Sequence, residues 1–290
     1  MADSQQDVDN NQYNQITDAY SILYPSDGES PSTFPLAAIE RHQVYLAMSD
    51  PSVDIRGKRV LDLACGSGYY ANQYLKWGAA SVTGMDISTG MLEAGRRSAA
   101  DRGFSESELK FVHGDATDEN LVIDGAPFDL VTGCWLLNYA PNAATMTKMY
   151  KFIARNLRPG GYWVGLSVPP LLSDAPYEAD MLNTALAPDG VWGKHGNLGK
   201  VLKAMPNGDG YLIRVELGTE VHKLKACFDC YHLSLKIFEQ ACHDSEMFER
   251  PEWKDFVIPG QVKTGAYEKD HWNSLCLWPH CRVFTAKRCT

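Results

Sequence analysis

The sequence predicts an α/β fold, a doubly wound parallel sheet with helices on both faces. Three observations predict it. Strand-like and helix-like patterns alternate at βαβ spacing from Lys58 to Val168. The apolar run Val60–Ala64 breaks into a turn that contains Gly66 and Gly68, and a helical pattern follows. Hydrophobic residues make up 44% of the 290 residues, which is enough for a complete core.

Five strands joined by helices are expected in order along this region. The strands cover Arg59–Ala64, Ser81–Asp86, Leu109–His113, Phe128–Gly133 and Tyr162–Val168. The clearest helices between them cover Ala71–Trp77, Ser88–Arg102 and Asn142–Leu157. Ser88 is an N-cap residue and Gly103 a stop signal. Pro159-Gly160-Gly161 is expected to end the last of these helices and to turn the chain into the fifth strand.

The flanks carry less regular patterns. Two amphipathic helices are expected before the sheet, and an irregular or short-helical segment, a strand hairpin, a helix and two terminal strands after it. These elements cover residues 13–23 and 35–48, then 169–207, 211–217 paired with 220–228, 233–243, and finally 256–258 and 276–286. The polar stretch Met1–Gln12 is expected to be disordered.

Composition argues against several classes of partner. The net charge is −9, and no basic stripe is visible, so nucleic acid is not expected as a partner. No apolar run reaches 18 residues, and Met1–Gln12 has no signal-peptide pattern, so we expect a cytoplasmic protein without a membrane partner. The eight cysteines are interpreted as reduced thiols. Cys227 and Cys230 have CxxC spacing, but no second pair follows at zinc-site distance, so no metal is expected.

The glycine turn is compatible with more than one cofactor. Gly66, Gly68 and Ala71 satisfy a loose dinucleotide fingerprint, and Asp86 follows at the distance expected for a ribose contact. Taken alone, this spacing does not separate the alternatives.

Three features favour a ligand with an amino acid at one end and an adenosine at the other. Asp62 lies inside the strand before the turn, where it can hold an ammonium group directly or through water. The turn itself offers no clear diphosphate cradle. Asp115 follows the third strand, where a carboxylate can accept a hydrogen bond from an adenine amino group. The Tyr-x-x-x-Lys pair of many small dehydrogenases is also absent from the sequence.

These motifs resemble the class I S-adenosylmethionine-dependent methyltransferases. The residues that carry the resemblance are Leu61–Gly68, Gly84–Ser88 with Met91, His113–Ala116, Phe128–Val131 and Leu157–Gly161. They follow the order and spacing of that family. Ala64 stands where many members have the first glycine of the turn. The flanks more loosely resemble small-molecule methyltransferases of the toxoflavin-synthase type.

The resemblance implies a Rossmann-like, mostly parallel seven-stranded sheet with an antiparallel terminal strand. It also implies a set of cofactor-binding residues. Asp62 would orient the methionine ammonium, Asp86 would accept both ribose hydroxyls, and Asp115 would bind the adenine amino group. The other expected contacts are Tyr20 in the lid, the turn residues Ala64, Gly66 and Gly68, Ile87 and Met91 on the adenine face, Ala116 beside Asp115, and Trp135 near the sulfonium. Each acid has a structural alternative: a strand-closing turn for Asp62, a helix cap for Asp86 and a plain turn for Asp115.

Methyl transfer needs alignment and exclusion of water more than dedicated catalytic groups. Trp135, Tyr139 and His195 are the catalytic candidates, for positioning or as a base, and His232 is a further candidate base. For each of them ordinary packing is an alternative. Tyr13, Tyr20 and Tyr24 are candidates for a lid over the cofactor, or for a helix that docks by its aromatic face.

The expected organisation has four parts. Residues 1–50 form a tail and helical lid, 51–168 the cofactor-binding core, 169–230 a substrate-cover insertion with the hairpin, and 231–290 a helix and strands that complete the sheet. The predicted function is methyl transfer from S-adenosyl-L-methionine to N or O of a small aromatic or heterocyclic metabolite, with S-adenosyl-L-homocysteine as product. Two alternatives remain. One is a nicotinamide-dependent oxidoreductase, and the other is a cofactor-binding protein that either is non-catalytic or catalyses another reaction.

Overall fold

The computed structural model describes residues 11–25, 35–170, 177–219, 224–259 and 269–290. Most of the expected disordered tail, residues 1–10, lies outside these residues, whereas Gln12 begins the first helix. No helix in the described part of the chain combines the length and apolarity needed to cross a membrane.

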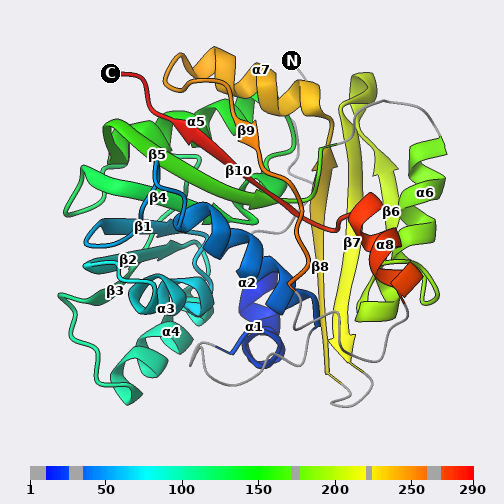
Figure 1. The fold of residues 1–290 in the computed structure, drawn as a ribbon, viewed down its shortest axis with the longest axis horizontal. Coiled ribbons are helices and arrows are strands. Elements are labelled where there is room, and N and C mark those ends of the chain that lie inside the picture. Colours follow the sequence, from blue (N-terminus) through cyan, green and yellow to red (C-terminus); the bar gives the residue numbers. More distant parts are fainter. Residues whose placement is uncertain (1–10, 26–34, 171–176, 220–223, 260–268) are drawn as a thin grey trace.

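A seven-stranded sheet forms the centre of the molecule (Figure 1). Its spatial order is β3 (Leu109–His113), β2 (Ser81–Asp86), β1 (Arg59–Leu63), β4 (Phe128–Cys134), β5 (Leu157–Ser167), β10 (Arg282–Lys287) and β9 (Glu252–Trp253). The strands β1 to β5 pair in parallel, and β10 pairs antiparallel with β5 and β9. The predicted Rossmann-like sheet with an antiparallel last strand is therefore confirmed.

Helices cover both faces of this sheet and bury a separate apolar core on each (Figure 1). One face carries α2 (Pro35–Met48), α3 (Tyr69–Lys76) and α4 (Thr89–Asp101), and the other carries α5 (Ala143–Asn156) and α7 (Leu235–Ser245). The predicted N-cap is confirmed, because Ser88 Oγ accepts the N–H of Met91. Asn142 caps α5 in the same way through the N–H of Thr145.

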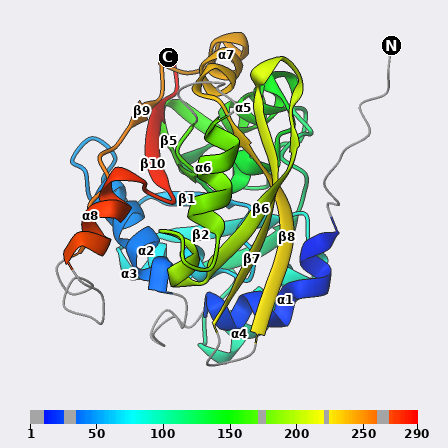
Figure 2. The same cartoon turned by 90° about the vertical axis from the view of Figure 1, so that its right-hand side faces the viewer.

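A second, antiparallel sheet follows β5 in the chain. It consists of β6 (Asn197–Ala204), β7 (Gly210–Thr219) and β8 (Leu224–Leu233), with α6 (Tyr177–Leu186) packed against β6 (Figure 2). The predicted hairpin corresponds to β7 and β8. The strand β6 was expected to be irregular. Most of its side chains are exposed or half-buried, so its sequence lacks the alternating apolar pattern of a strand.

Three further expectations about elements are wrong. The Pro159-Gly160-Gly161 segment does not separate α5 from a strand but lies inside β5, which begins at Leu157 and pairs there with Phe128 before a register shift. A strand was expected from Cys276, but that residue belongs to α8 (Lys269–Leu277). Pro279 ends this helical segment and excludes a central strand before β10 begins. The strand expected at Phe256–Ile258 lies earlier, at β9.

The cysteines form no metal site or disulfide among the described residues. Cys227 is exposed and Cys230 is buried. Their spacing of three along β8 places them on opposite faces of the strand.

Candidate active site

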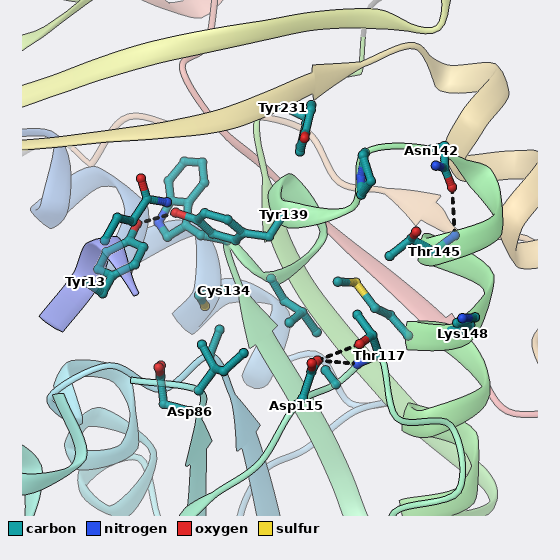
Figure 3. Close-up of a pocket in the computed structure, with 18 of the residues that line it drawn as sticks. Tyr13, Asp86, Asp115, Thr117, Cys134, Tyr139, Asn142, Thr145, Lys148 and Tyr231 are labelled. Atoms are coloured by element: carbon teal, nitrogen blue, oxygen red, sulfur yellow. Dashed lines mark hydrogen bonds between the residues drawn. The ribbon is translucent and has the colours of Figure 1, made fainter. Parts of the chain in front are cut away.

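A cavity of about 740 Å³ lies at the carboxyl ends of β1, β2, β3 and β4 (Figure 3). This edge is where open α/β sheets bind ligands. The cavity brings together most of the predicted site residues. Those that line it are Tyr20, Ala64, Gly66, Asp86, Ile87, Met91, Asp115, Ala116, Trp135 and Tyr139. Asp62, Gly68 and His195 do not line it.

Asp86 ends β2 and holds the glycine turn against the sheet. Its Oδ2 accepts the N–H of Gly66 at 2.8 Å, and its Oδ1 accepts the N–H of Ser88 at 2.8 Å. Burial raises the pKa of Asp86, and these N–H groups act against that shift. Asp86 is therefore more than a helix cap: it connects two ligand-facing segments, and its carboxylate faces the cavity.

The glycine turn uses its two glycines for different purposes. Gly66 has φ 54°, and a Cβ on it would meet nothing within 4 Å. Its backbone therefore borders open space in the cavity. Gly68 has φ 88°, and a Cβ there would come within 2.8 Å of the Phe111 ring. Gly68 packs against Phe111 of β3 and does not line the cavity, so its expected backbone contact with the cofactor stays a prediction.

Strained backbone borders the cavity at two non-glycine residues. Ala64 has φ 53° and Trp135 has φ 67°, both in the left-handed region. The left-handed φ of Ala64 explains why glycine is common at this position in the methyltransferase family that the sequence resembles. Trp135 is held in this conformation partly by the hydrogen bond from its N–H to Leu166 O at 2.7 Å. Such strain concentrates at functional sites.

Asp62 lies in β1 beneath the turn and is 1% exposed. Its Oδ1 accepts a hydrogen bond from Thr132 Oγ1 at 2.8 Å, whereas Oδ2 has no hydrogen-bond partner among the described residues. Burial raises the pKa of Asp62 to about 7, and the Thr132 bond acts against that rise. The bond goes to a neighbouring strand, so Asp62 does not close a local turn. The expected contact of Asp62 with the methionine ammonium stays a prediction, because Asp62 does not line the cavity.

Asp115 follows β3 and lines the cavity (Figure 3). Its Oδ1 accepts both the N–H and the Oγ1 hydroxyl of Thr117 at 2.8 Å. The alternative of a turn-forming aspartate is thus confirmed, but it uses only one oxygen. The second oxygen of a carboxylate in this position can still accept a hydrogen bond from a ligand.

Tyrosines close the cavity opposite the carboxylates. The hydroxyls of Tyr13 and Tyr139 are hydrogen-bonded to each other, and the two side chains point toward one another (Figure 3). Tyr20 packs edge-on against Tyr13, with ring centroids 5.5 Å apart, and stacks on Tyr24 at 4.9 Å. Burial raises the pKa values of Tyr13, Tyr20 and Tyr139, so all three are neutral at pH 7.

The helix α1 (Gln12–Leu23) carries Tyr13 and Tyr20 across the cavity. At the core, Asn14 Oδ1 accepts hydrogen bonds from Ser88 Oγ at 2.8 Å and from Gly90 N at 3.0 Å. At the second sheet, the Gln12 amide exchanges two hydrogen bonds with the backbone of Asp229. The helix therefore bridges the two sheets above the cavity. Gln12 and Asn14 were missed by the sequence analysis, because polar side chains near a chain end carry no periodic signal.

The structure does not bring the predicted histidines to the cavity. His195 is buried in the short helix η2 (Gly193–His195) and lines no part of it. His232 is buried in β8, and its Nε2 lies 2.6 Å from Pro169 O. Burial lowers the pKa of His232 to about 4, so this ring stays neutral. The prediction of either histidine as a base in the acceptor pocket is therefore not supported.

A smaller cavity of about 60 Å³ adjoins the first behind the tyrosines. The two cavities share the side chains Tyr13, Tyr20, Trp135 and Tyr139. The small cavity continues beneath the second sheet and reaches Glu40 and His280. Both were missed in the sequence. A signal existed only for Glu40, which lies at helical spacing with Leu36 and Val44 on the apolar face of α2.

Comparisons with known proteins identify the domain. Residues 60–161 match the model of a methyltransferase domain. A demethylmenaquinone methyltransferase of Clavibacter sepedonicus is 39% identical over 142 residues, which are 48% of this chain and 54% of that protein. A ubiquinone biosynthesis O-methyltransferase of Paracidovorax citrulli is 32% identical over 44% of this chain and 50% of that protein. The chain thus spans about half the length of these curated relatives.

Solved structures share the fold over nearly the whole chain. An S-adenosylmethionine-dependent methyltransferase from Clostridium acetobutylicum aligns with a TM-score of 0.54 and 16% identity, over 96% of this chain and 99% of that one. Magnesium protoporphyrin IX methyltransferase from Synechocystis, solved with bound S-adenosylmethionine, aligns with a TM-score of 0.55 and 13% identity, over 99% and 100%. The motifs, the sheet order and the matched family agree. Residues 60–161 thus match a methyltransferase domain, and the fold is that of S-adenosylmethionine-dependent methyltransferases.

Proposed function

We propose that this protein transfers a methyl group from S-adenosyl-L-methionine to N or O of a small aromatic or heterocyclic metabolite. One observation carries the proposal. The large cavity, whose wall contains Asp86 and Asp115, shares the side chains of Tyr13, Tyr20, Trp135 and Tyr139 with a second, smaller cavity. The first cavity has room for a nucleoside cofactor, and a small acceptor would lie against the aromatic side chains that the two cavities share.

The proposed cofactor contacts follow the geometry of the wall. Asp86 would accept the ribose hydroxyls, Asp115 would accept the adenine amino group, and the backbone at Gly66 would pass beneath the methionine part. The cavity volume of about 740 Å³ lies in the range of ligand sites. When bound, the cofactor supplies an electrophilic methyl group on a positively charged sulfur.

The protein's own contribution is alignment and exclusion of water. The aromatic rings of Tyr13, Tyr20 and Trp135 border both cavities, where their faces can stabilise a nearby cation and keep water out. No proton has to be moved at the leaving group. A base is needed only where the acceptor carries a proton that it must lose.

The lining of the small cavity favours a compact acceptor. Its walls include Trp192, Ile213, Val215 and Phe228, which suit a planar, largely apolar ring. The net charge of −9 disfavours nucleic acid as the acceptor. A cytoplasmic location stays a prediction.

Calorimetry of the full chain tests the proposal. S-adenosylhomocysteine should bind and NADH should not. Asp86→Asn removes charge-assisted hydrogen bonds worth about 1.5–3 kcal/mol, so it should weaken S-adenosylhomocysteine about 10- to 100-fold. Asp118→Asn is the matched control, because Asp118 is exposed and caps the N–H of Asn120 only. Equal affinities of the two variants would contradict the proposed site. A screen for methylated products then separates an enzyme from a non-catalytic binding protein.

A further inference from the structure

One end of the large cavity lies outside the proposed cofactor contacts. It is bounded by the start of α5 and by the turn between β6 and β7. In Figure 3 the α5 side chains lie on the side of the cavity opposite Asp86, with Asp115 between them. We call this part the lysine end, and its polar lining residues are Asn142, Thr145, Lys148, Lys203, Asn207 and Asp209.

The helix α5 presents three hydrogen-bond donors to the lysine end. Asn142, Thr145 and Lys148 follow one another at a spacing of three, so they lie on one side of the helix (Figure 3). Asn142 Oδ1 accepts the N–H of Thr145 at 2.9 Å, which leaves the NH₂ group of Asn142 to donate to a ligand. Lys148 makes no ion pair with an acid in the described part of the chain, whereas Lys151, further along α5, pairs with Glu119 at 3.8 Å. The charge of Lys148 is therefore available to a ligand in the cavity.

A bulge in β6 brings Lys203 to the same end. An unbroken register with β7 would place Lys203 opposite Tyr211. A shift between Val201 and Lys203 places it opposite Leu212 instead, and Leu212 pairs with Tyr231 of β8. Because opposite residues share a face of a sheet and neighbours alternate, the shift turns Lys203 to the face of Tyr231, which lines the large cavity. Bulges re-aim side chains in this way next to functional sites.

The charges along the cavity are separated. The cofactor wall carries the acids Asp86 and Asp115. The lysine end carries two lysines and one acid, Asp209, which gives a net charge of +1 for its described side chains. One negative charge balances this end, whereas the two charges of a phosphate group would exceed it. A carboxylate is the common monoanion that accepts hydrogen bonds from ammonium, amide and hydroxyl donors together.

A continuous wall connects the lysine end to the proposed position of the acceptor. Trp135, Tyr139, Pro141 and Asn142 follow one another along the chain, and all of them line the large cavity. An acceptor ring against Trp135 and Tyr139 would therefore reach the lysine end within this one cavity. The carboxylate of the cofactor is a less suitable partner, because Asp86, which holds the glycine turn, lies on the side opposite α5 (Figure 3).

Resting on the methyl transfer proposed above, we infer that the acceptor carries a carboxylate group, which Lys148 and Lys203 bind together with Asn142 and Thr145. The carboxylate is the recognition group and is not the methylated group. It holds the acceptor while the N or O atom of the ring faces the methyl group. The two lysines therefore determine acceptor specificity and do not hold the cofactor.

Matched pairs of aromatic acids and amides test the recognition group. The probes are para-hydroxybenzoate with para-hydroxybenzamide and anthranilate with anthranilamide, titrated by calorimetry into the full chain saturated with S-adenosylhomocysteine. At least one acid should bind about 10-fold more tightly than its amide, because the amide lacks the charge that the lysines bind. Equal affinities within both pairs, or no binding of either acid, overturn the inference. Tighter binding of phenyl phosphate than of both acids overturns the choice of a carboxylate.

Variants of the two lysines assign the preference to this end of the cavity. Lys148→Gln and Lys203→Gln should each weaken the acid by about 3- to 10-fold and leave the amide within about twofold. Lys148→Arg keeps the charge and should keep the preference for the acid. The affinity for S-adenosylhomocysteine should stay within about threefold in all three variants. A larger loss of that affinity would assign the lysines to the cofactor and overturn the inference.

The matched controls are Lys151→Gln in α5 and Lys200→Gln in β6, which remove lysines that do not line the cavity. Both should bind the acid as the wild type does. An equal loss of acid affinity in these controls would reveal a general effect of protein charge and overturn the inference. If S-adenosylhomocysteine does not bind the wild-type protein, the proposed function fails instead, and acid and amide are then compared on the free protein.

Discussion

Replacing Asp62 with asparagine should remove a pH dependence from the stability of the free protein. The carboxyl group of Asp62 has a pKa of about 7 in the folded protein because it is buried with only one hydrogen bond. In the unfolded chain its pKa is about 3.9. The folded state therefore holds this proton up to a higher pH than the unfolded state. The contribution to stability falls as the pH rises from about 4 through about 7.

The size of the effect follows from the two pKa values. Between pH 5 and pH 8 the folded protein must give up the proton while the unfolded chain has already done so. The cost is about two pKa units, or roughly 3 kcal/mol. The asparagine side chain of the variant has no such proton. Its amide oxygen can accept a hydrogen bond from the Thr132 hydroxyl, as the carboxyl oxygen does. Its NH₂ group has no obvious acceptor, so the free energy of unfolding of the variant at pH 5 should be about 1–3 kcal/mol below that of the wild type.

Urea unfolding at pH 5 and pH 8 measures this difference. The free energy of unfolding should fall by about 3 kcal/mol more in the wild type than in Asp62→Asn over that range, because all other titrating groups are shared. Asp118→Asn, an exposed aspartate, should behave like the wild type. Parallel pH profiles for wild type and Asp62→Asn would refute the assignment of a raised pKa to Asp62. Binding of S-adenosylhomocysteine should also release a proton near pH 7 if its ammonium group lies close to Asp62.

Further predictions concern the turn and the helix that crosses the cavity. Gly68→Ala should lower the free energy of unfolding by about 2–4 kcal/mol, since its Cβ meets Phe111 at 2.8 Å in a left-handed conformation; chemical denaturation checks this, and an unchanged midpoint contradicts it. Gly66→Ala should cost only about 1–2 kcal/mol of stability but should weaken S-adenosylhomocysteine in calorimetry, because its Cβ enters the cavity; full affinity would be the opposing result. Asn14→Ala removes two hydrogen bonds that hold α1 to the core and should speed hydrogen exchange of the α1 amides by about 5- to 30-fold; the same exchange rates as in wild type would argue against this anchor.

The core sheet and much of the cavity wall could be predicted because local sequence determines them. Buried parallel strands are continuous apolar runs, and the residues at their carboxyl ends meet at one edge by topology alone. Asp86 and Asp115 reached the cavity for this reason. Gly68 was expected to contact the cofactor, because a sequence cannot distinguish a glycine that faces a ligand from one that packs against an aromatic side chain.

The small cavity could not be predicted because its walls come from distant segments. Glu40 and His280 are 240 residues apart in the chain and meet only in the folded structure. The helix α1 bridges elements through Gln12 and Asn14, which no periodic pattern marks. His195 and His232 were selected by residue type in a plausible segment, yet both are buried and line neither cavity. The first strand of the second sheet, β6, was missed because none of its side chains is buried.

A crystal structure of the full chain with S-adenosylhomocysteine would show directly whether the large cavity binds the nucleoside. We expect the ribose hydroxyls within hydrogen-bond distance of the Asp86 carboxylate, the adenine amino group beside Asp115, and the sulfur near Trp135 and facing the small cavity. A nucleoside bound elsewhere, or one bound here with neither carboxylate in contact, would contradict it.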